Sequence, residues 1–344
     1  MSNMIRTLVM RKFSQRKIAP NMVINTPNGI VEEQFIPIGG IEQWISIRGE
    51  NRHNPVLLIV HGGPGSTYGV LSPLLRSWEK CFTVVQWDQR GAGHTFRKNS
   101  KKGSGKLTFE RLVDDGIEVS EYLKTHLCQE KIILIGSSVG SVIGVMMAHN
   151  RPDLFYVYVG TEQVSPDGYA LAYQMTLDGY RNAGNTKAVR EVERIGSHFA
   201  TLSRKDFDRM NKLTVSANRQ VPHMITDVML PAMLTAPGYS LRDLSDIIRG
   251  INFSLDQLFD ELMAVDLLNL GLNFNLPFFI FQGEGDWLAP PVAAQAYLDR
   301  INAPCKAMVL IQGAGHLAMF ANPGQFLHEL LHRVRPLAVA TPNP

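Results

Sequence analysis

Cysteine is scarce in this chain of 344 residues. The three cysteines are odd in number, lie far apart and form no Cys-x-x-Cys pair (Cys81, Cys128 and Cys305). This pattern indicates neither a disulfide framework nor a cysteine-ligated zinc site, and we expect no metal and no cofactor. It also favours a reducing compartment, so we expect a cytoplasmic protein.

Long apolar runs and a strong net charge are missing as well. No stretch of about 18 apolar residues occurs, so we expect no membrane span. The formal net charge is only +3, and no basic run is interleaved with aromatic residues, which argues against a nucleic-acid partner. The expected partner is therefore a small molecule or a short peptide.

Acidic residues are absent from residues 1–17, which carry several basic ones (Arg6, Arg11, Lys12, Arg16 and Lys17). The segment lacks the apolar core of a secretory signal. A basic start without acids is typical of organelle transit peptides and of membrane-surface helices, but we favour a solvated extension. A linker rich in proline and asparagine follows, so we interpret residues 1–30 as an N-terminal extension and linker.

One stretch is typical of a nucleophile turn. An apolar run at 131–135 leads into Gly136-Ser137-Ser138-Val139-Gly140, and an apolar segment of helical length follows. This order predicts a strand, a tight turn carrying Ser138 and a helix. Small flanking residues permit a strained serine and a close approach of the helix to neighbouring strands. Taken alone, the pentapeptide also fits an ordinary strand-to-helix turn.

The rest of the chain predicts alternating strands and helices. Strands are expected at 34–38, 41–48, 55–60, 82–87, 155–159, 277–281 and 306–311, and helices at 107–127 and 323–333. Residues 100–105 read as a mobile surface loop, and residues 165–266 as a mostly helical insertion. This alternation predicts an α/β fold with a mostly parallel sheet covered on both faces. We therefore expect an α/β-hydrolase core at 31–163 and 271–344, with a helical cap at 164–270.

Polar groups follow several predicted strands, where parallel sheets carry functional residues. A serine needs a base to remove its proton, and a histidine base needs a carboxylate to hold it. Ser138, Asp286 and His316 each follow a strand, in the chain order expected of an α/β-hydrolase. Glu284 is the alternative acid. The two oxyanion donors are expected to be the N–H groups of Gly63 and Val139.

Other polar residues near these strand ends have structural interpretations. We expect His61 to shape its turn by hydrogen bonding. His94 is placed in a mobile loop near the site, and Asp88 and Arg90 are expected to form a structural pair.

Several motifs resemble those of the proline iminopeptidase (prolyl aminopeptidase) branch of the α/β-hydrolases. They cover residues 30–160 and 275–335, and they are His61-Gly62-Gly63-Pro64-Gly65, Trp87-Asp88-Gln89-Arg90-Gly91, Gly136-Ser137-Ser138-Val139-Gly140-Ser141, Gly283-Glu284-Gly285-Asp286 and Gly313-Ala314-Gly315-His316. The resemblance implies a serine hydrolase that removes an N-terminal residue, often proline, from short peptides. It also implies a helical cap inserted between the nucleophile and acid strands.

The chain departs from this branch at two places. Many members carry tryptophan after the nucleophile, where this chain has Val139. Members typically have a Trp-Glu pair in the cap whose acid binds the substrate's amine, but no tryptophan lies in the expected cap here. We therefore assign amine binding to Glu162, with Gly62 as a second substrate-binding residue. The alternative for Glu162 is a solvated loop carboxylate.

These observations lead to a ranked set of functions. An aminopeptidase acting on short peptides or aminoacyl amides comes first, and a carboxylesterase or thioesterase comes second. A non-catalytic ligand receptor is the third, and the complete Ser, Asp and His set argues against it. An epoxide hydrolase or a dehalogenase would need aspartate in place of Ser138.

Overall fold

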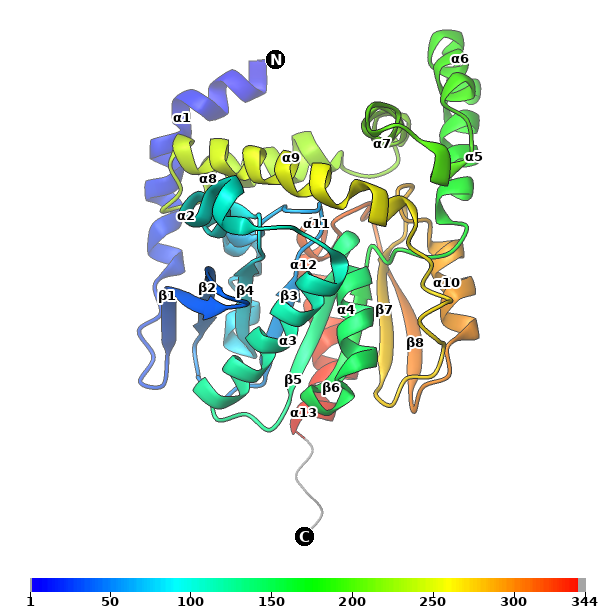
Figure 1. Ribbon diagram of the computed structural model, residues 1–344. Helices are drawn as coiled ribbons and strands as arrows, with labels where there is room; N and C mark the ends of the chain where they lie inside the picture. The colour runs from blue at the N-terminus through cyan, green and yellow to red at the C-terminus, as the bar shows by residue number, and fades with distance from the viewer. Residues whose placement is uncertain (1, 340–344) are drawn as a thin grey trace.

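The computed structural model describes residues 2–339, which are organised around an eight-stranded sheet (Figure 1). The strand order is β1-β2-β4-β3-β5-β6-β7-β8. The strands are β1 (Ile30–Ile38), β2 (Ile41–Gly49), β3 (Val56–Val60), β4 (Thr83–Asp88), β5 (Ile132–Ser137), β6 (Phe155–Thr161), β7 (Phe278–Gly283) and β8 (Lys306–Ile311). The β1–β2 hairpin is antiparallel and β2 runs antiparallel to β4, whereas all other neighbours are parallel. The predicted α/β fold class is confirmed.

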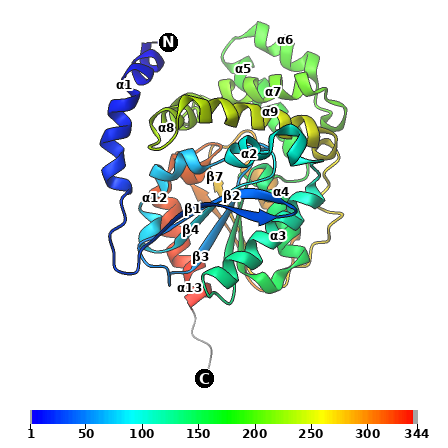
Figure 2. The ribbon, with the colours of Figure 1, turned by 60° about the vertical axis from the view of Figure 1, so that its left-hand side comes forward.

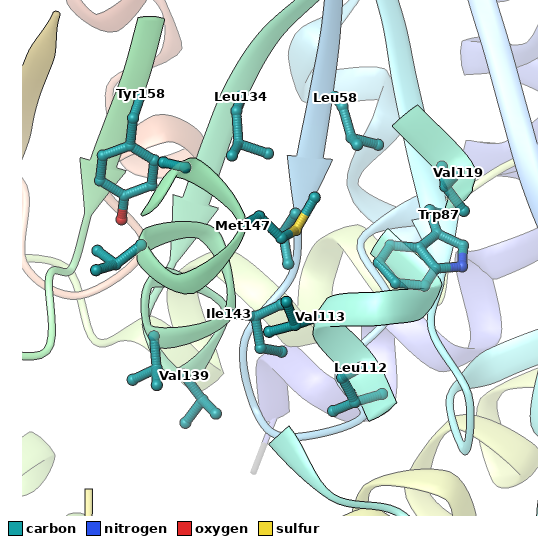
Figure 3. Close-up of a cluster of buried hydrophobic side chains, with 14 of the residues drawn as sticks. Leu58, Trp87, Leu112, Val113, Val119, Leu134, Val139, Ile143, Met147 and Tyr158 are labelled. Atoms are coloured by element: carbon teal, nitrogen blue, oxygen red, sulfur yellow. The ribbon is translucent and has the colours of Figure 1, made fainter. Parts of the chain in front are cut away.

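Both faces of the sheet are buried, which explains the continuous apolar runs. Leu58 and Leu134 face one side, where they join a cluster with α3 (Phe109–His126) and α4 (Val139–Asn150) (Figure 3). Leu57 and Ile133 face the other side, towards η2 (Gly69–Leu75), α11 (Ala318–Ala321) and α12 (Pro323–Glu329). The chain thus places one helical layer on each face. The remaining elements outside the cap are η1 (Ala19–Met22), which precedes the sheet, and η3 (Trp78–Lys80), η4 (Pro152–Leu154), α10 (Pro291–Arg300), η7 (Leu330–Val334) and α13 (Arg335–Val339).

A helical segment separates β6 from β7 in the sequence. It consists of α5 (Gly168–Asn182), α6 (Thr186–Ile195), η5 (Phe199–Thr201), α7 (Arg204–Ala217), the π-helix η6 (Met224–Met229), α8 (Leu230–Thr235) and α9 (Leu241–Met263). These helices lie together over one edge of the sheet (Figures 1 and 2). We call this segment the cap; its division from the core at residues 164 and 270 stays a prediction.

The N-terminal segment differs from the solvated extension that its composition suggests. It forms the helix α1 (Ser2–Ile18), which packs beside α8 (Figure 2). The Gln15 amide donates to the carbonyls of Ala236 (2.7 Å) and Tyr239 (3.0 Å), and Arg11 also donates to Tyr239 O. These carbonyls lie just beyond the end of α8, where carbonyl groups no longer find N–H donors within the helix. Among the described residues, no helix combines the length and apolar character needed to cross a membrane.

Residues 100–105 also differ from the prediction of a mobile loop. Residues up to Ser104 belong to the helix α2 (Gly93–Ser104), which breaks at Ser100, where φ is 57°. Ser104 Oγ donates to Ser100 O at 2.7 Å, and Arg90 Nη1 donates to Ser104 O at 2.9 Å. The lysine, glycine and serine composition of this segment predicts a loop. Composition alone cannot show that Arg90 binds the last carbonyl group of the helix.

Candidate active site

Ser138 lies at a sharp turn between β5 and α4. Its backbone is left-handed, with φ of 52°. The flanking glycines are required sterically: a Cβ atom at Gly136 would lie 2.8 Å from Gly140 O, and one at Gly140 would lie 2.2 Å from Val60 O. The predicted strand, turn and helix therefore occur as expected, and the close approach explains why both flanking positions are glycine.

A chain of hydrogen bonds connects Ser138, His316 and Asp286. His316 Nε2 lies 3.1 Å from Ser138 Oγ, and His316 Nδ1 lies 2.9 Å from Asp286 Oδ2. Asp286 is fully buried, and its Oδ1 accepts from the N–H groups of Leu288 (2.9 Å) and Ala289 (3.0 Å). These contacts orient the carboxylate towards Nδ1. The structure thus brings together the three residues that the sequence singles out.

The charge of Asp286 influences the proton affinity of His316. Burial disfavours the imidazolium, but the charge and the hydrogen bond of Asp286, together with the charge of Glu162, raise the pKa of His316 overall. Since Nδ1 faces the carboxylate, it carries the proton, and the free lone pair of Nε2 points to the serine hydroxyl. In this tautomer the ring can accept the proton of Ser138.

The glycine-rich loop after β3 passes directly beside this serine. A Cβ atom at Gly62 would lie 2.7 Å from Ser138 Cβ and 3.2 Å from Val139 N. Gly63, with φ of 116°, follows in the same loop. The two expected oxyanion donors, Gly63 and Val139, therefore belong to neighbouring segments. The N–H of Gly62 donates to Tyr68 Oη at 3.3 Å, so the structure directs this group into the protein.

Glu162 does not lie where the sequence-based proposal needs it. Its side chain is fully buried, and its carboxylate accepts hydrogen bonds from Ser137 Oγ (2.6 Å), Thr161 Oγ1 (2.8 Å) and Ala318 N (2.6 Å). It is therefore neither a substrate-facing group nor a solvated loop carboxylate. We withdraw the assignment of Glu162 to amine binding, because three protein donors already occupy a carboxylate that has no exposed surface.

A small, partly open cleft lies beside His316. The cap contributes Thr214, Val215, Asn218, Val221, Pro222, His223 and Met224 to its lining. The core contributes Asp286, Trp287, Leu288 and His316. Asn218 Nδ2 donates to Gly285 O at 2.6 Å, which ties the cap to the loop that carries Asp286. The sequence analysis assigned none of these cap residues to the site, because nothing in their local pattern shows that the 214–224 segment folds back over the sheet.

Two other polar expectations have mixed outcomes. His61 shapes its turn as expected: Nδ1 donates to Gly62 O at 3.0 Å and Nε2 accepts from Gln89 N at 3.3 Å. Burial lowers the pKa of His61, which favours this neutral form. Asp88 and Arg90 do not pair with each other. Asp88 Oδ2 instead lies 3.0 Å from Nδ1 of His94, which is the second residue of α2 and is not part of a mobile loop.

Comparison with known proteins identifies the family to which the chain belongs. A family model described as the alpha/beta hydrolase fold matches residues 55–323. The probable aminopeptidase YbaC of Bacillus subtilis (strain 168) is 27% identical over 316 residues, which are 87% of this chain and 95% of that protein. A proline iminopeptidase of Lactobacillus delbrueckii subsp. bulgaricus is 23% identical over 292 residues, covering 83% of this chain and 92% of the relative.

Solved structures agree on the fold. A proline iminopeptidase-related protein from Thermus thermophilus superposes with a TM-score of 0.60 at 17% identity, covering 91% of this chain and all of the other. The family model extends from the start of β3 to the start of α12 and so includes Ser138, Asp286 and His316. The chain therefore belongs to the alpha/beta hydrolase fold family.

Proposed function

We propose that this protein is a serine hydrolase that works through an acyl-enzyme on Ser138. The observation that carries the proposal is the pair of contacts made by His316, with Nε2 3.1 Å from Ser138 Oγ and Nδ1 2.9 Å from Asp286 Oδ2. A serine hydroxyl becomes an effective nucleophile only when a base removes its proton during attack. The arrangement supplies that base and holds it in the required tautomer.

The reaction follows from these positions. His316 accepts the Ser138 proton as Oγ attacks the substrate carbonyl, and Asp286 stabilises the imidazolium. The tetrahedral oxyanion accepts hydrogen bonds from the N–H groups of Gly63 and Val139. His316 then gives its proton to the leaving group, which departs and leaves an acyl-Ser138 ester. A water molecule then attacks this ester while His316 takes a proton from it, and His316 returns that proton to Ser138 Oγ as the acid product leaves.

An aminopeptidase acting on short peptides or aminoacyl amides is the first candidate. Its support is the naming of the relatives: the Bacillus subtilis protein is a probable aminopeptidase, and others are proline iminopeptidases. The relatives match this chain over most of its length, including the cap.

A carboxylesterase or thioesterase is the second candidate, and the lining of the cleft favours it. Among the described residues that line the cleft, Asp286 is the only acid, and its oxygens accept from Leu288 N, Ala289 N and His316. A buried substrate ammonium needs a carboxylate or several acceptors, since an unpaired charge is costly to bury. An uncharged acyl or alcohol group needs no such partner.

A hydrolysis screen separates the two candidates. Free aminoacyl anilides, their N-acetylated counterparts and simple acyl esters are compared by kcat/KM, with Ser138→Ala as the blank. Preference for free amines supports the aminopeptidase, and preference for esters supports the second candidate. Wild-type activity that survives Ser138→Ala, or a fluorophosphonate probe that labels Ser137 or Ser141 instead, contradicts the serine mechanism.

A further inference from the structure

A buried hydrogen-bond network centred on Glu162 connects the ends of two strands with the loop that carries His316. Glu162 follows β6, and its Oε2 accepts from Ser137 Oγ, the last residue of β5, at 2.6 Å. Its Oε1 accepts from Thr161 Oγ1 at 2.8 Å and from Ala318 N at 2.6 Å. Ser137 directly precedes Ser138, and Ala318 lies two residues after His316. One carboxylate therefore holds both the serine turn and the histidine loop.

The network continues to the glycine-rich loop. Gly62 N donates to Tyr68 Oη at 3.3 Å, Tyr68 Oη lies 2.8 Å from Ser137 Oγ, and Ser137 donates to Glu162. A backbone N–H only donates and a carboxylate only accepts, so the two ends set the direction of the whole chain. Every proton in it points towards Glu162. Burial raises the pKa of Glu162 overall, against the charge of His316 and the hydrogen bonds from Ser137 and Thr161. Three protein donors face the carboxylate, and they favour its ionised form because charge-assisted hydrogen bonds are the strong ones.

Left-handed backbone gathers at the same place. Ser138, Glu162 and Leu317 are three of the six non-glycine residues with positive φ in the described part of the chain, at 52°, 47° and 71°. Such conformations persist only where the surroundings hold them. The hydrogen bond from Ala318 N to Glu162 joins two of these strained segments, and the bond from Ser137 joins the third.

We propose that Glu162 is a positioning residue that acts through His316 and Ser138, fixing the histidine loop, the serine turn and, through Tyr68, the loop of Gly63. The inference rests on the proposed serine mechanism. It also gives the buried carboxylate an electrostatic role: a second negative charge beside the ring stabilises the imidazolium that forms during attack. Neither role requires Glu162 to contact substrate.

The charged and titratable groups around His316 can be named from each neighbouring element. Asp286 approaches from the loop after β7 and Glu162 from the end of β6, and both charges raise the pKa of the ring. Tyr68 from the start of η2 contacts the network, and His223 from the cap lines the same cleft. Tyr68 stays protonated, because burial raises its pKa. Glu162 is therefore the carboxylate whose neutralisation tests the electrostatic role without breaking the bond between His316 and Asp286.

Glu162→Gln is the central variant. Its carbonyl oxygen can replace Oε1 and keep the bonds from Thr161 and Ala318. Its amide nitrogen then faces Ser137 Oγ as a donor, so the Ser137 hydroxyl proton loses its present acceptor and the relay can no longer end on residue 162. We expect kcat to fall by up to about a hundredfold, because catalysis is sensitive to small misplacements. KM should change little.

The pH dependence of kcat/KM separates the electrostatic role of Glu162 from a purely structural one, because a purely structural role would leave it unchanged. Losing a negative charge lowers the pKa of His316, so the acid limb of kcat/KM should shift to lower pH. The same shift should appear in the rate of Ser138 labelling by a fluorophosphonate. Glu79→Gln is the matched control, since Glu79 is also buried but pairs with Arg48. It should reduce stability and leave the profile in place.

Tyr68→Phe tests the relay separately. It removes the link to Gly62 but leaves the charge of Glu162, so kcat should fall without a shift of the acid limb. In a double-mutant cycle with Glu162→Gln, the two losses should be less than additive. Additive losses, or a Glu162→Gln profile identical to wild type, would overturn the inference. If Glu162→Gln does not fold, full activity in Tyr68→Phe and Ser137→Ala overturns it. Failure of the wild type to be labelled at Ser138 refutes the serine mechanism instead.

Discussion

Arg90 and Asp115 form a buried, two-pronged ion pair. Arg90 Nε lies 2.8 Å from Asp115 Oδ2, and Arg90 Nη2 lies 3.1 Å from Oδ1. The same guanidinium donates to Ser104 O at the end of α2 and to Gly39 O in the β1–β2 turn. One arginine therefore joins a helix end, a hairpin and α3.

Arg90→Met should destabilise the protein markedly. It leaves a fully buried Asp115 without its main partner, and breaking such a pair typically costs about 3–5 kcal/mol. Arg111 and Gln43 still contact Asp115, so the lower end of that range is expected. Urea unfolding measures the loss. The control Arg151→Met removes surface pairs with Glu121 and Asp153 and should cost less than about 1 kcal/mol.

Asp286→Asn should reduce kcat by about 10⁴-fold while the fold remains. The asparagine oxygen can still accept from Leu288 N and Ala289 N, which turns its NH₂ towards His316 Nδ1. That contact favours the tautomer protonated on Nε2, which cannot take the serine proton. Steady-state kinetics test this, with circular dichroism as the folding check. The exposed neighbour Glu284 provides the control: if Glu284→Gln is inactive and Asp286→Asn active, the acid is misassigned.

Gly140→Ala should destabilise the turn that carries Ser138. The new methyl group would lie 2.2 Å from Val60 O and 2.5 Å from His61 O, so α4 or β3 must shift. Overpacking of this kind typically costs about 1–3 kcal/mol. Gly324→Ala in α12 is the matched control, because nothing lies within 4 Å of its Cβ position. Equal unfolding free energies for the two variants would show that the close approach does not matter.

The His94–Asp88 pair should make stability depend on pH. Burial opposes the His94 charge, but the Asp88 hydrogen bond and charge raise the pKa of His94 overall. Burial likewise opposes the Asp88 charge, yet contacts with His94 and Thr67 lower the pKa of Asp88. The His94 contribution is therefore present below its unfolded pKa of about 6.5 and is lost as the pH rises through the folded value. The Asp88 contribution is lost only as the pH falls through its own lowered value.

Unfolding free energies of wild type and His94→Asn should thus differ more near about pH 5.5 than near about pH 8.5. Asp88 stays ionised at both values, so the change reports on the histidine. A difference that does not depend on pH would mean that His94 stabilises α2 by packing alone. The His94 ring contacts Trp44 and Tyr239, so its packing also contributes to the free energy of unfolding at every pH.

The placement of the candidate catalytic groups could be predicted from the sequence because that information is local. Ser138, Asp286 and His316 each follow a short buried strand, and parallel strands bring such ends to one edge. The fold class followed from the same alternation. Glycines at 136 and 140 marked a close approach, and the structure supplies the backbone oxygens that require it.

Glu162, Arg90 and the cap residues show where local information ends. Whether Glu162 points into a cleft or beneath Ser138 depends on its left-handed backbone and on donors from Ser137 and Ala318, which lie far away in the sequence. Arg90 pairs with Asp115 in α3 because the helix packs beside it, and no spacing rule links the two residues. Long-range contacts of this kind decide side-chain direction after the strands are in place.

The cap contacts have a consequence for protein engineering. Asn218 binds the carbonyl of Gly285, and a Cβ atom at either Gly285 or Gly315 would lie within 2.7 Å of a Val221 methyl group. The cap segment therefore helps to hold the loops of Asp286 and His316 in position, whereas the position of Ser138 is set by the sheet. A cap transplanted from a relative to change substrate range would carry part of this bracing with it. Such chimeras should keep Asn218 and Val221, or exchange both loops together with the cap.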